Sequence, residues 1–166
     1  MRVLGIDCGS EYTGYGVVEE TDGRITCHAA GAIKLRAGSP MAQRLDRIFS
    51  DLKDIIAEHK PDTVAIEDVF YAVNVKTALK LGQVRGVAML AASSSGLQVA
   101  EYSPLSIKSA VVGYGKAEKE QVQLMVTRLL KLSAPPEPMD ASDALAIAIC
   151  HIHTVSTNNR YQAASR

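Results

Sequence analysis

The apolar pattern of the chain changes its period once, about a quarter of the way along, and this change limits the fold more than any other feature. Before it, short alternating apolar runs predict three strands, at 2–7, 14–19 and 25–35. Asp22-Gly23 lies between the second and third runs and predicts a tight hairpin turn. The N-terminal part of the chain is therefore expected to form an antiparallel meander.

After the meander the pattern predicts helices and strands in alternation. Ser39 is expected to cap the first helix, with Pro40 as its first residue. Strands that are joined through helices add in parallel to a sheet. The sequence thus predicts an α/β fold, a five-stranded mixed sheet flanked by helices. The expected elements are helices at 40–60, 74–93, 104–112, 118–132 and 141–154, and strands at 63–67 and 97–101.

The helix at 74–93 carries two kinds of packing signal. Five of its residues are expected to face the core, namely Leu79, Val84, Val87, Ala88 and Ala91. Gly82 and Gly86, one helical turn apart, allow close approach of another element. This element is either the sheet of the same chain or a helix of a partner, and the sequence favours neither.

Length and composition limit the remaining possibilities. A chain of 166 residues predicts one domain at 1–154, followed by a polar, flexible tail at 155–166. An apolar content of 47% excludes wholesale disorder, and no apolar run reaches the length of a membrane span. Three widely spaced cysteines favour a reducing compartment, the cytoplasm, over a disulfide framework or a zinc site.

Charge is unevenly distributed although the net charge is zero. Residues 1–69 hold eight basic and twelve acidic residues, whereas 70–119 hold six basic and two acidic residues. The basic segment could meet a polyanion, or its lysines could simply be solvated. Its basic residues are Lys76, Lys80, Arg85, Lys108, Lys116 and Lys119.

Two predicted strands end on an acid, Asp7 and Glu67, and neighbouring strands lie only about 4.8 Å apart. Asp140 and Asp143 share a face at the start of the last helix. Four carboxylates meeting in one pocket would favour a hard divalent ion, Mg²⁺ or Mn²⁺. The alternative for the second pair is helix capping and an interaction with the helix dipole.

Motifs along nearly the whole chain resemble those of the crossover-junction endodeoxyribonuclease RuvC family. They run in family order: GIDCGS at 5–10, TGYGV at 13–17, AIEDVF at 65–70, ALKLGQ at 78–83, RG at 85–86, VVG at 111–113, AEK at 117–119, QVQ at 121–123 and DASDALA at 140–146.

The resemblance implies a ribonuclease-H-like fold and a homodimer that nicks four-way (Holliday) DNA junctions in recombination and repair. It implies two Mg²⁺ ions per site, which Mn²⁺ could replace, and products with 5′-phosphate and 3′-hydroxyl ends. A RuvA–RuvB branch-migration complex is a further possible partner. The implied catalytic and metal-binding acids are Asp7, Glu67, Asp140 and Asp143.

Other residues take roles from the same resemblance. Lys119 is expected near the scissile phosphate together with Lys108, and Phe70 is expected to contact bases at the junction centre. The basic residues of 70–119 are expected to bind DNA. Cys8 departs from the family, which usually has proline there, and either loosens the placement of Asp7 or is merely a small buried residue.

Three other functions compete with this hypothesis. A nuclease of the same fold could act on RNA or on another DNA structure, and a non-catalytic module could bind junctions without cutting them. The Asp7-x-Gly9-Ser10 motif also suggests an actin-like phosphotransferase. That fold needs two duplicated halves, which 166 residues cannot hold.

Overall fold

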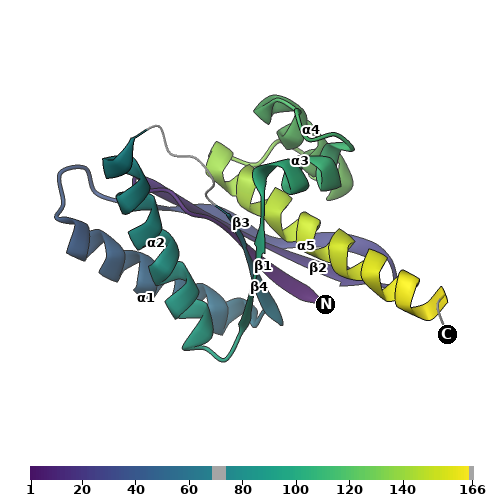
Figure 1. Ribbon diagram of the computed structural model, residues 1–166, viewed down its shortest axis with the longest axis horizontal. Coiled ribbons are helices and arrows are strands. Elements are labelled where there is room, and N and C mark those ends of the chain that lie inside the picture. The colour runs from purple at the N-terminus through teal and green to yellow at the C-terminus, as the bar shows by residue number, and fades with distance from the viewer. Residues whose placement is uncertain (69–73, 165–166) are drawn as a thin grey trace.

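One five-stranded mixed sheet organises the protein, shown as a computed structural model that describes residues 1–68 and 74–164 (Figure 1). The strands lie in the order β3-β2-β1-β4-β5. β1 pairs antiparallel with β2 and parallel with β4, so the predicted mixed sheet is confirmed. The strands are β1 (Arg2–Asp7), β2 (Tyr12–Thr21), β3 (Arg24–Lys34), β4 (Thr63–Glu67) and β5 (Gln98–Tyr102).

Helices cover both faces of the sheet. One face carries α1 and α2, and the other carries α5 with α3 and α4 beside it (Figure 1). The helices are α1 (Met41–His59), α2 (Val75–Ser93), α3 (Pro104–Val112), α4 (Lys119–Leu129) and α5 (Met139–Ala164).

Local sequence signals set several of these boundaries. Asp22 and Gly23 both adopt positive φ, at 53° and 78°, which is the geometry of the two-residue turn that matches strand twist. Asn74 accepts a hydrogen bond from the Thr77 backbone N–H and so caps α2. The cap predicted for α1 is wrong, because Pro40 and not Ser39 occupies the N-cap position and the helix begins at Met41.

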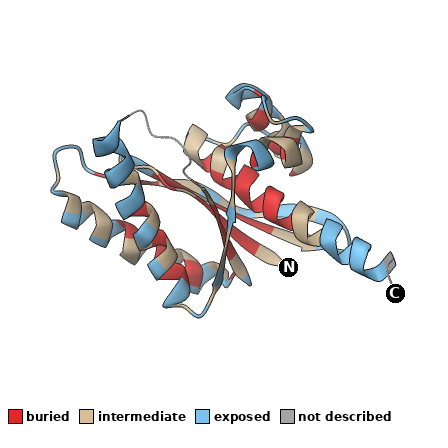
Figure 2. Cartoon of the chain, viewed as in Figure 1, coloured by how far each residue is buried: buried red, intermediate tan, exposed pale blue. Residues whose placement is uncertain are grey.

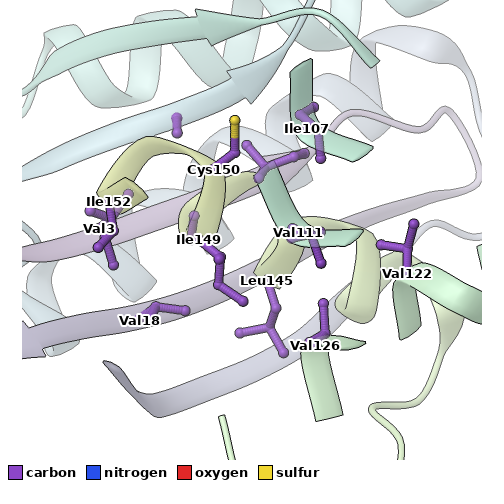
Figure 3. Close-up of a cluster of buried hydrophobic side chains, with 14 of the residues drawn as sticks. Val3, Val18, Ile107, Val111, Val122, Val126, Leu145, Ile149, Cys150 and Ile152 are labelled. Atoms are coloured by element: carbon purple, nitrogen blue, oxygen red, sulfur yellow. The ribbon is translucent and has the colours of Figure 1, made fainter. Parts of the chain in front are cut away.

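Alternation along β1 sends neighbouring side chains to opposite faces of the sheet. Leu4 and Ile6 belong to the core under α1 and α2, whereas Val3 belongs to the core under α5. Figure 3 shows this second core, in which Val3 lies with Leu145 and Ile149 of α5. The two cores fix the sheet between its helical layers.

Two glycines bring α5 into direct contact with the sheet. A Cβ at Gly5 would overlap the backbone of Ala144 and Ala148, and one at Gly14 would overlap the carbonyl oxygen of Asp140. The absence of side chains at these strand positions therefore lets the first turns of α5 lie against β1 and β2.

The outer face of α2 differs from the expectation. Leu79 was predicted to face the core, but 65% of it is exposed. Gly82 and Gly86 lie on the same face, and in 1–68 and 74–164 no atom lies within 4 Å of a Cβ placed at either glycine. Packing of these glycines on the sheet of the same chain, one of the two interpretations above, is thus contradicted.

The last helix is longer than the sequence predicted. It continues through Ala164, so residues 155–164 extend α5 rather than form a frayed tail. No glycine or proline interrupts this segment, which removes the usual signals for helix termination. Its surface becomes exposed toward the C-terminus (Figure 2). The division into one domain at 1–154 stays a prediction.

Candidate active site

A hollow of about 320 Å³ opens where β1 and β4 end, between the sheet and helices α3, α4 and α5. Three acids line it, one from each of β1, β4 and α5, and two lysines face them from α3 and α4. The charged lining residues are Asp7, Glu67, Asp143, Lys108 and Lys119. Ile107, Val122 and Ile147 form part of the apolar wall. The structure thus brings three of the four predicted acids together at this edge of the sheet.

The alternation of side chains between the two faces of a strand explains why two of the acids point into the hollow. Asp7 follows Val3 and Gly5 on the α5 face of β1, and Glu67 follows Ala65 on the same face of β4. The register pairs Gly5 with Ala65 and Ile6 with Ile66, so both strands reach the same edge together. β1 and β4 therefore deliver two carboxylates to one side of the sheet.

Repulsion and burial act together on these carboxylates. Burial raises the pKa of Asp7 to about 7, and repulsion by the three other acids adds to the shift, while Lys119 opposes it. Burial also raises the pKa of Glu67, with Asp143 contributing and both lysines opposing. The hollow thus holds more negative charge than its lysines neutralise.

Lys119 makes the closest contact between opposite charges in the hollow. Its Nζ donates to Asp143 Oδ2 at 2.8 Å, and this bond is the main reason that the pKa of Lys119 is raised. Lys119 is the first residue of α4, which begins with a capping box formed by Glu118 and Gln121. The capped helix start fixes the position from which the lysine reaches the acids.

Asp140 is placed differently from the other three acids. It lies in the first turn of α5, where its backbone packs against Gly14, the cross-strand partner of Asp7. Its charge contributes to raising the pKa of Asp7, but it is not among the residues that line the hollow. The structure therefore brings Asp140 near Asp7 without placing it in the hollow's wall.

The acids are not gathered into a ready metal cage. Over residues 1–68 and 74–164, no three His, Cys, Asp or Glu side chains are close enough to hold a metal ion. One reason is the bond from Asp143 to Lys119, which turns that carboxylate toward an ammonium. The donors are nevertheless all carboxylate oxygens, the type that Mg²⁺ prefers.

The loop that follows Asp7 is held in place by hydrogen bonds to three consecutive carbonyl groups of its own backbone. The Gly9 oxygen accepts from the Thr13 hydroxyl at 3.0 Å, and the Ser10 oxygen accepts from the Arg44 guanidinium at 3.0 Å. The Glu11 oxygen accepts from the Leu35 backbone N–H at 3.0 Å. Each residue of the loop is thus fixed by a different segment: Gly9 by Thr13 of β2, Ser10 by Arg44 of α1, and Glu11 by Leu35, which directly follows β3. Sequence reasoning missed Thr13 and Arg44 in this role, because only the fold brings them to the loop.

Cys8 points away from the acids. It lies in the core under α1 and α2 with Leu4 and Ile6, on the other face of the sheet. Burial raises its pKa to about 12, so the thiol stays protonated. The structure supports the interpretation of Cys8 as a small buried residue.

The other basic residues expected to bind DNA have different surroundings. Lys76, Lys80 and Lys116 are exposed outside the hollow. Arg85 donates to the Glu67 carbonyl oxygen at 3.3 Å and forms ion pairs with Asp68 and Glu101.

Arg85 therefore ties α2 to β4 and β5. DNA contacts by these four residues stay predictions, and Phe70 lies outside the described residues.

None of the helices within 1–68 and 74–164 combines the length and apolar character needed to cross a membrane.

Comparison with known proteins shows the family of this chain. The family model for crossover junction endodeoxyribonuclease RuvC matches residues 3–151. The RuvC proteins of Koribacter versatilis and Acidobacterium capsulatum are 63% identical over 164 residues and 55% identical over 170 residues. Each comparison covers 98% of this chain and 99% of the relative.

A solved structure gives the same result for the fold. Thermus thermophilus RuvC in complex with a Holliday junction substrate superposes with a TM-score of 0.90 at 33% identity. The superposition covers 95% of this chain and 96% of that one, which confirms the predicted ribonuclease-H-like sheet and its helical layers. The chain belongs to the crossover junction endodeoxyribonuclease RuvC family.

Proposed function

We propose that the protein cleaves four-way DNA junctions by hydrolysing a phosphodiester bond at the acidic hollow. The observation that carries this proposal is the meeting of Asp7, Glu67 and Asp143 with two lysines in one hollow at the sheet edge. A relative of 33% identity was solved with a Holliday junction as its substrate. Fold, residue chemistry and family therefore favour the same reaction.

The acids fit divalent metal ions in their donor chemistry. Asp7, Glu67 and Asp143 would supply carboxylate oxygens, and Asp140 would add one from the same turn of α5. The raised pKa values of Asp7 and Glu67 show that their negative charge is under-compensated, which a bound cation would relieve. When bound, two Mg²⁺ ions would supply an activated water and would stabilise the leaving 3′-oxygen. Mn²⁺ is expected to replace them.

The lysines have a separate part in the reaction. While Lys119 is bonded to Asp143, it offsets the carboxylate charge that would repel an incoming phosphate. The Lys119 ammonium has further N–H donors, which would donate to a phosphoryl oxygen of the bound strand. Lys108 faces the same hollow from α3 and adds a second positive charge there. The products would carry 5′-phosphate and 3′-hydroxyl ends.

A nicking assay with an end-labelled immobile junction tests the proposal. Wild-type protein with Mg²⁺ should nick two opposed strands symmetrically, and EDTA should abolish nicking. Asp7→Asn, Glu67→Gln and Asp143→Asn should each lower the rate at least about a thousandfold while retaining junction binding. The matched control is Asp54→Asn, which neutralises an exposed acid on α1 and should leave the rate unchanged. Wild-type nicking by the Asp7 or Glu67 variant would refute the role assigned to these carboxylates.

The same assay separates the competing functions. Preferred cleavage of an RNA duplex or of linear DNA would favour the nuclease with another substrate. Junction binding without nicking in Mg²⁺ or Mn²⁺ would favour the non-catalytic module. A Mg²⁺-dependent rise in Tm of the wild type that is lost in Asp7→Asn would report metal binding independently of cleavage.

A homodimer is the second part of the proposal, and the outer face of α2 supports it. Val75, Leu79 and Leu90 are exposed on this face, and no described residue comes within 4 Å of a Cβ placed at Gly82 or Gly86. Two such helices could approach closely across a two-fold axis, because the glycines carry no side chain to separate them. Two sites related by this axis match the two equivalent strands of a junction.

Sedimentation measurements test the dimer. Leu79→Glu should shift the protein to monomer at micromolar concentration, because it places a charge at the centre of the proposed interface. Leu124→Glu alters another exposed leucine, on α4, and should leave the dimer intact. A wild-type monomer, or a dimer that Leu79→Glu does not weaken, would contradict the assignment of this face.

The cellular setting follows from the proposed reaction. An enzyme that resolves junctions acts in recombination and repair, on chromosomal DNA in the cytoplasm. All three cysteines are free thiols, which fits a reducing compartment. Docking on a RuvA–RuvB complex stays a prediction from the family resemblance.

A further inference from the structure

At the end of the sheet that carries Asp7, basic side chains gather at a second place, separate from the acidic hollow. The end of β3, the loop at 35–40 and the first turns of α1 surround a hollow of about 310 Å³. The basic corner, as we name this surface, consists of Lys34, Arg36, Arg44 and Arg47, all of which line the hollow. Residues 34–47 contain one acid, Asp46, although 1–69 are acidic overall.

The strand register places the basic corner beside the site. Lys34 pairs with Tyr12 across β2 and β3, and Asp7 pairs with Gly14 across β1 and β2. Lys34 and Asp7 therefore lie at the same end of the sheet, two strands or about 10 Å apart laterally. Lys108 and Lys119 lie on the opposite flank of the acids, on α3 and α4. Positive charge thus flanks the acidic hollow on both sides.

The four cations are not equally free. Arg44 is bonded to the Ser39 and Ser10 carbonyl oxygens, and Arg47 is paired with Asp51 at 2.6 Å. Lys34 and Arg36 are exposed, and within the described part of the chain neither side chain has a hydrogen bond or ion pair. The ammonium of Lys34 lies 6.0 Å from the centre of the Tyr12 ring, at the outer reach of a cation–π contact.

We propose that the basic corner binds the phosphate backbone of a duplex arm of the DNA substrate, on the β3 side of the cut. The proposal rests on the proposed function, since it takes the substrate to be DNA that extends beyond the hollow. Lys34 and Arg36 are the principal contacts, because no hydrogen bond or ion pair from the described residues holds either charge. Arg44 links this surface to the catalytic loop through its bond to Ser10.

A duplex fits this surface better than an acidic protein does. The surface continues past Tyr12 into a second hollow of about 440 Å³ that Lys34, Arg36 and Arg44 also line. Double-stranded DNA presents about one charge every 1.7 Å, so it can engage a row of separated cations. The span of about 10–17 Å from Asp7 to the tips of these side chains corresponds to roughly three to five base pairs.

Junction binding as a function of salt tests the proposal. The variant is Lys34→Gln with Arg36→Gln, measured by fluorescence anisotropy in EDTA, where no cleavage occurs. The control is Arg24→Gln with Arg160→Gln, which removes the same charge from exposed arginines away from the sheet end that holds Asp7. Both pairs lie on the surface, and Tm measurements verify that each variant folds.

The test variant should weaken junction binding about five- to thirtyfold at 150 mM salt. The slope of log Kd against log salt should fall by about 2, since each lost phosphate contact removes about 0.9. The control should change Kd less than about twofold. Hydroxyl-radical footprints should lose protection roughly three to five base pairs from the cut in the test variant alone.

Three results would overturn the inference, and they differ in what they mean for the proposed function. If wild-type protein nicks junctions but the test variant keeps the wild-type affinity, salt slope and footprint, the basic corner does not bind DNA and the proposed function stands. If both variants weaken binding equally, the effect is one of net charge, which also overturns the assignment. If wild-type protein neither binds nor nicks junctions, the proposed function fails and this inference fails with it.

Discussion

Asp7 and Cys8 are neighbours in the chain, yet they lie on opposite faces of the sheet and in different chemical surroundings. Burial raises the pKa of both, to about 7 for Asp7 and to about 12 for Cys8. Asp7 faces Lys119 and three other acids, whereas Cys8 faces the aliphatic side chains under α1 and α2. Burial is the main reason that the Cys8 thiol stays protonated, whereas at Asp7 burial acts together with repulsion by three other acids.

The two faces also differ in how their helices approach the strands. On the α5 face, Gly5 and Gly14 let the helix backbone touch the sheet. On the other face, Leu4, Ile6 and Val17 separate the sheet from α1 and α2 with a layer of side chains. The close approach on the α5 face brings Asp140 and Asp143 toward Asp7, so the glycines act on the site through the position of α5.

Filling the α5 face should have the largest effect on stability. Gly5→Ala should cost roughly 4 kcal/mol or more of unfolding free energy, because its methyl group would overlap the backbone of Ala144 and Ala148. Backbone atoms of a helix cannot move aside individually, so α5 must shift as a unit. Urea denaturation followed by circular dichroism measures the loss.

A second measurement separates position from stability. At a temperature at which Gly5→Ala remains folded, it should also nick junctions poorly, because α5 carries Asp143. Gly38→Ala is the control for replacing a glycine by alanine. A Cβ at Gly38 has no described atom within 4 Å, although the φ of 77° at this residue carries a strain of about 1 kcal/mol. Equal costs for the two variants would refute the close contact of α5 with β1.

Removing the Asp7 charge should have the next largest effect, and it should stabilise the metal-free protein. The folded-state pKa near 7 lies above the unfolded value of 3.8, so between these pH values the folded state keeps a proton that the unfolded chain has lost. Wild-type stability therefore falls as pH rises from about 4 to 7. Asp7→Asn should escape this loss and gain on the order of 4 kcal/mol at pH 8, because a tenfold difference in acidity corresponds to about 1.4 kcal/mol and the two pKa values are 3.8 and about 7.

Urea denaturation in EDTA at pH 4.5 and pH 8 checks this expectation. The stabilisation by Asp7→Asn should be small at pH 4.5 and complete at pH 8. Asp54→Asn, at an exposed position on α1, should show no comparable dependence. A gain of equal size at both pH values would show that the ionisation of Asp7 is not its cause.

Much of this arrangement could be predicted from local sequence. The bounds of β1 and β4 agree with the predicted strands because each is a short apolar run that ends on an acid. The same parity places Asp7 and Glu67 on one face, so the meeting of these two acids required only the strand order. The hairpin at Asp22-Gly23 was predictable from two residues that tolerate positive φ.

Other features depend on which surfaces remain uncovered, and local sequence does not record this. Leu79 fits the apolar period of α2 but lies on its exposed face, because no element among the residues that the structure describes covers it. The net charge of 1–69 is negative, so it gave no sign of the basic corner. The cations of this surface come from β3, a loop and α1, and only the fold brings them together. The bond from Lys119 to Asp143 likewise joins two helices whose relative placement no local pattern fixes.

The smallest expected effect concerns Cys8, and it tests whether the two faces act independently. Cys8→Ala should cost about 1 kcal/mol through a small cavity and should change the nicking rate less than twofold, since the thiol lies on the face away from the acids. Thr13→Val should lower the rate more, about tenfold, because it releases the Gly9 carbonyl group that holds the loop after Asp7. If instead Cys8→Ala slowed nicking as much as Thr13→Val, the residue in the usual proline position would itself be setting the placement of Asp7.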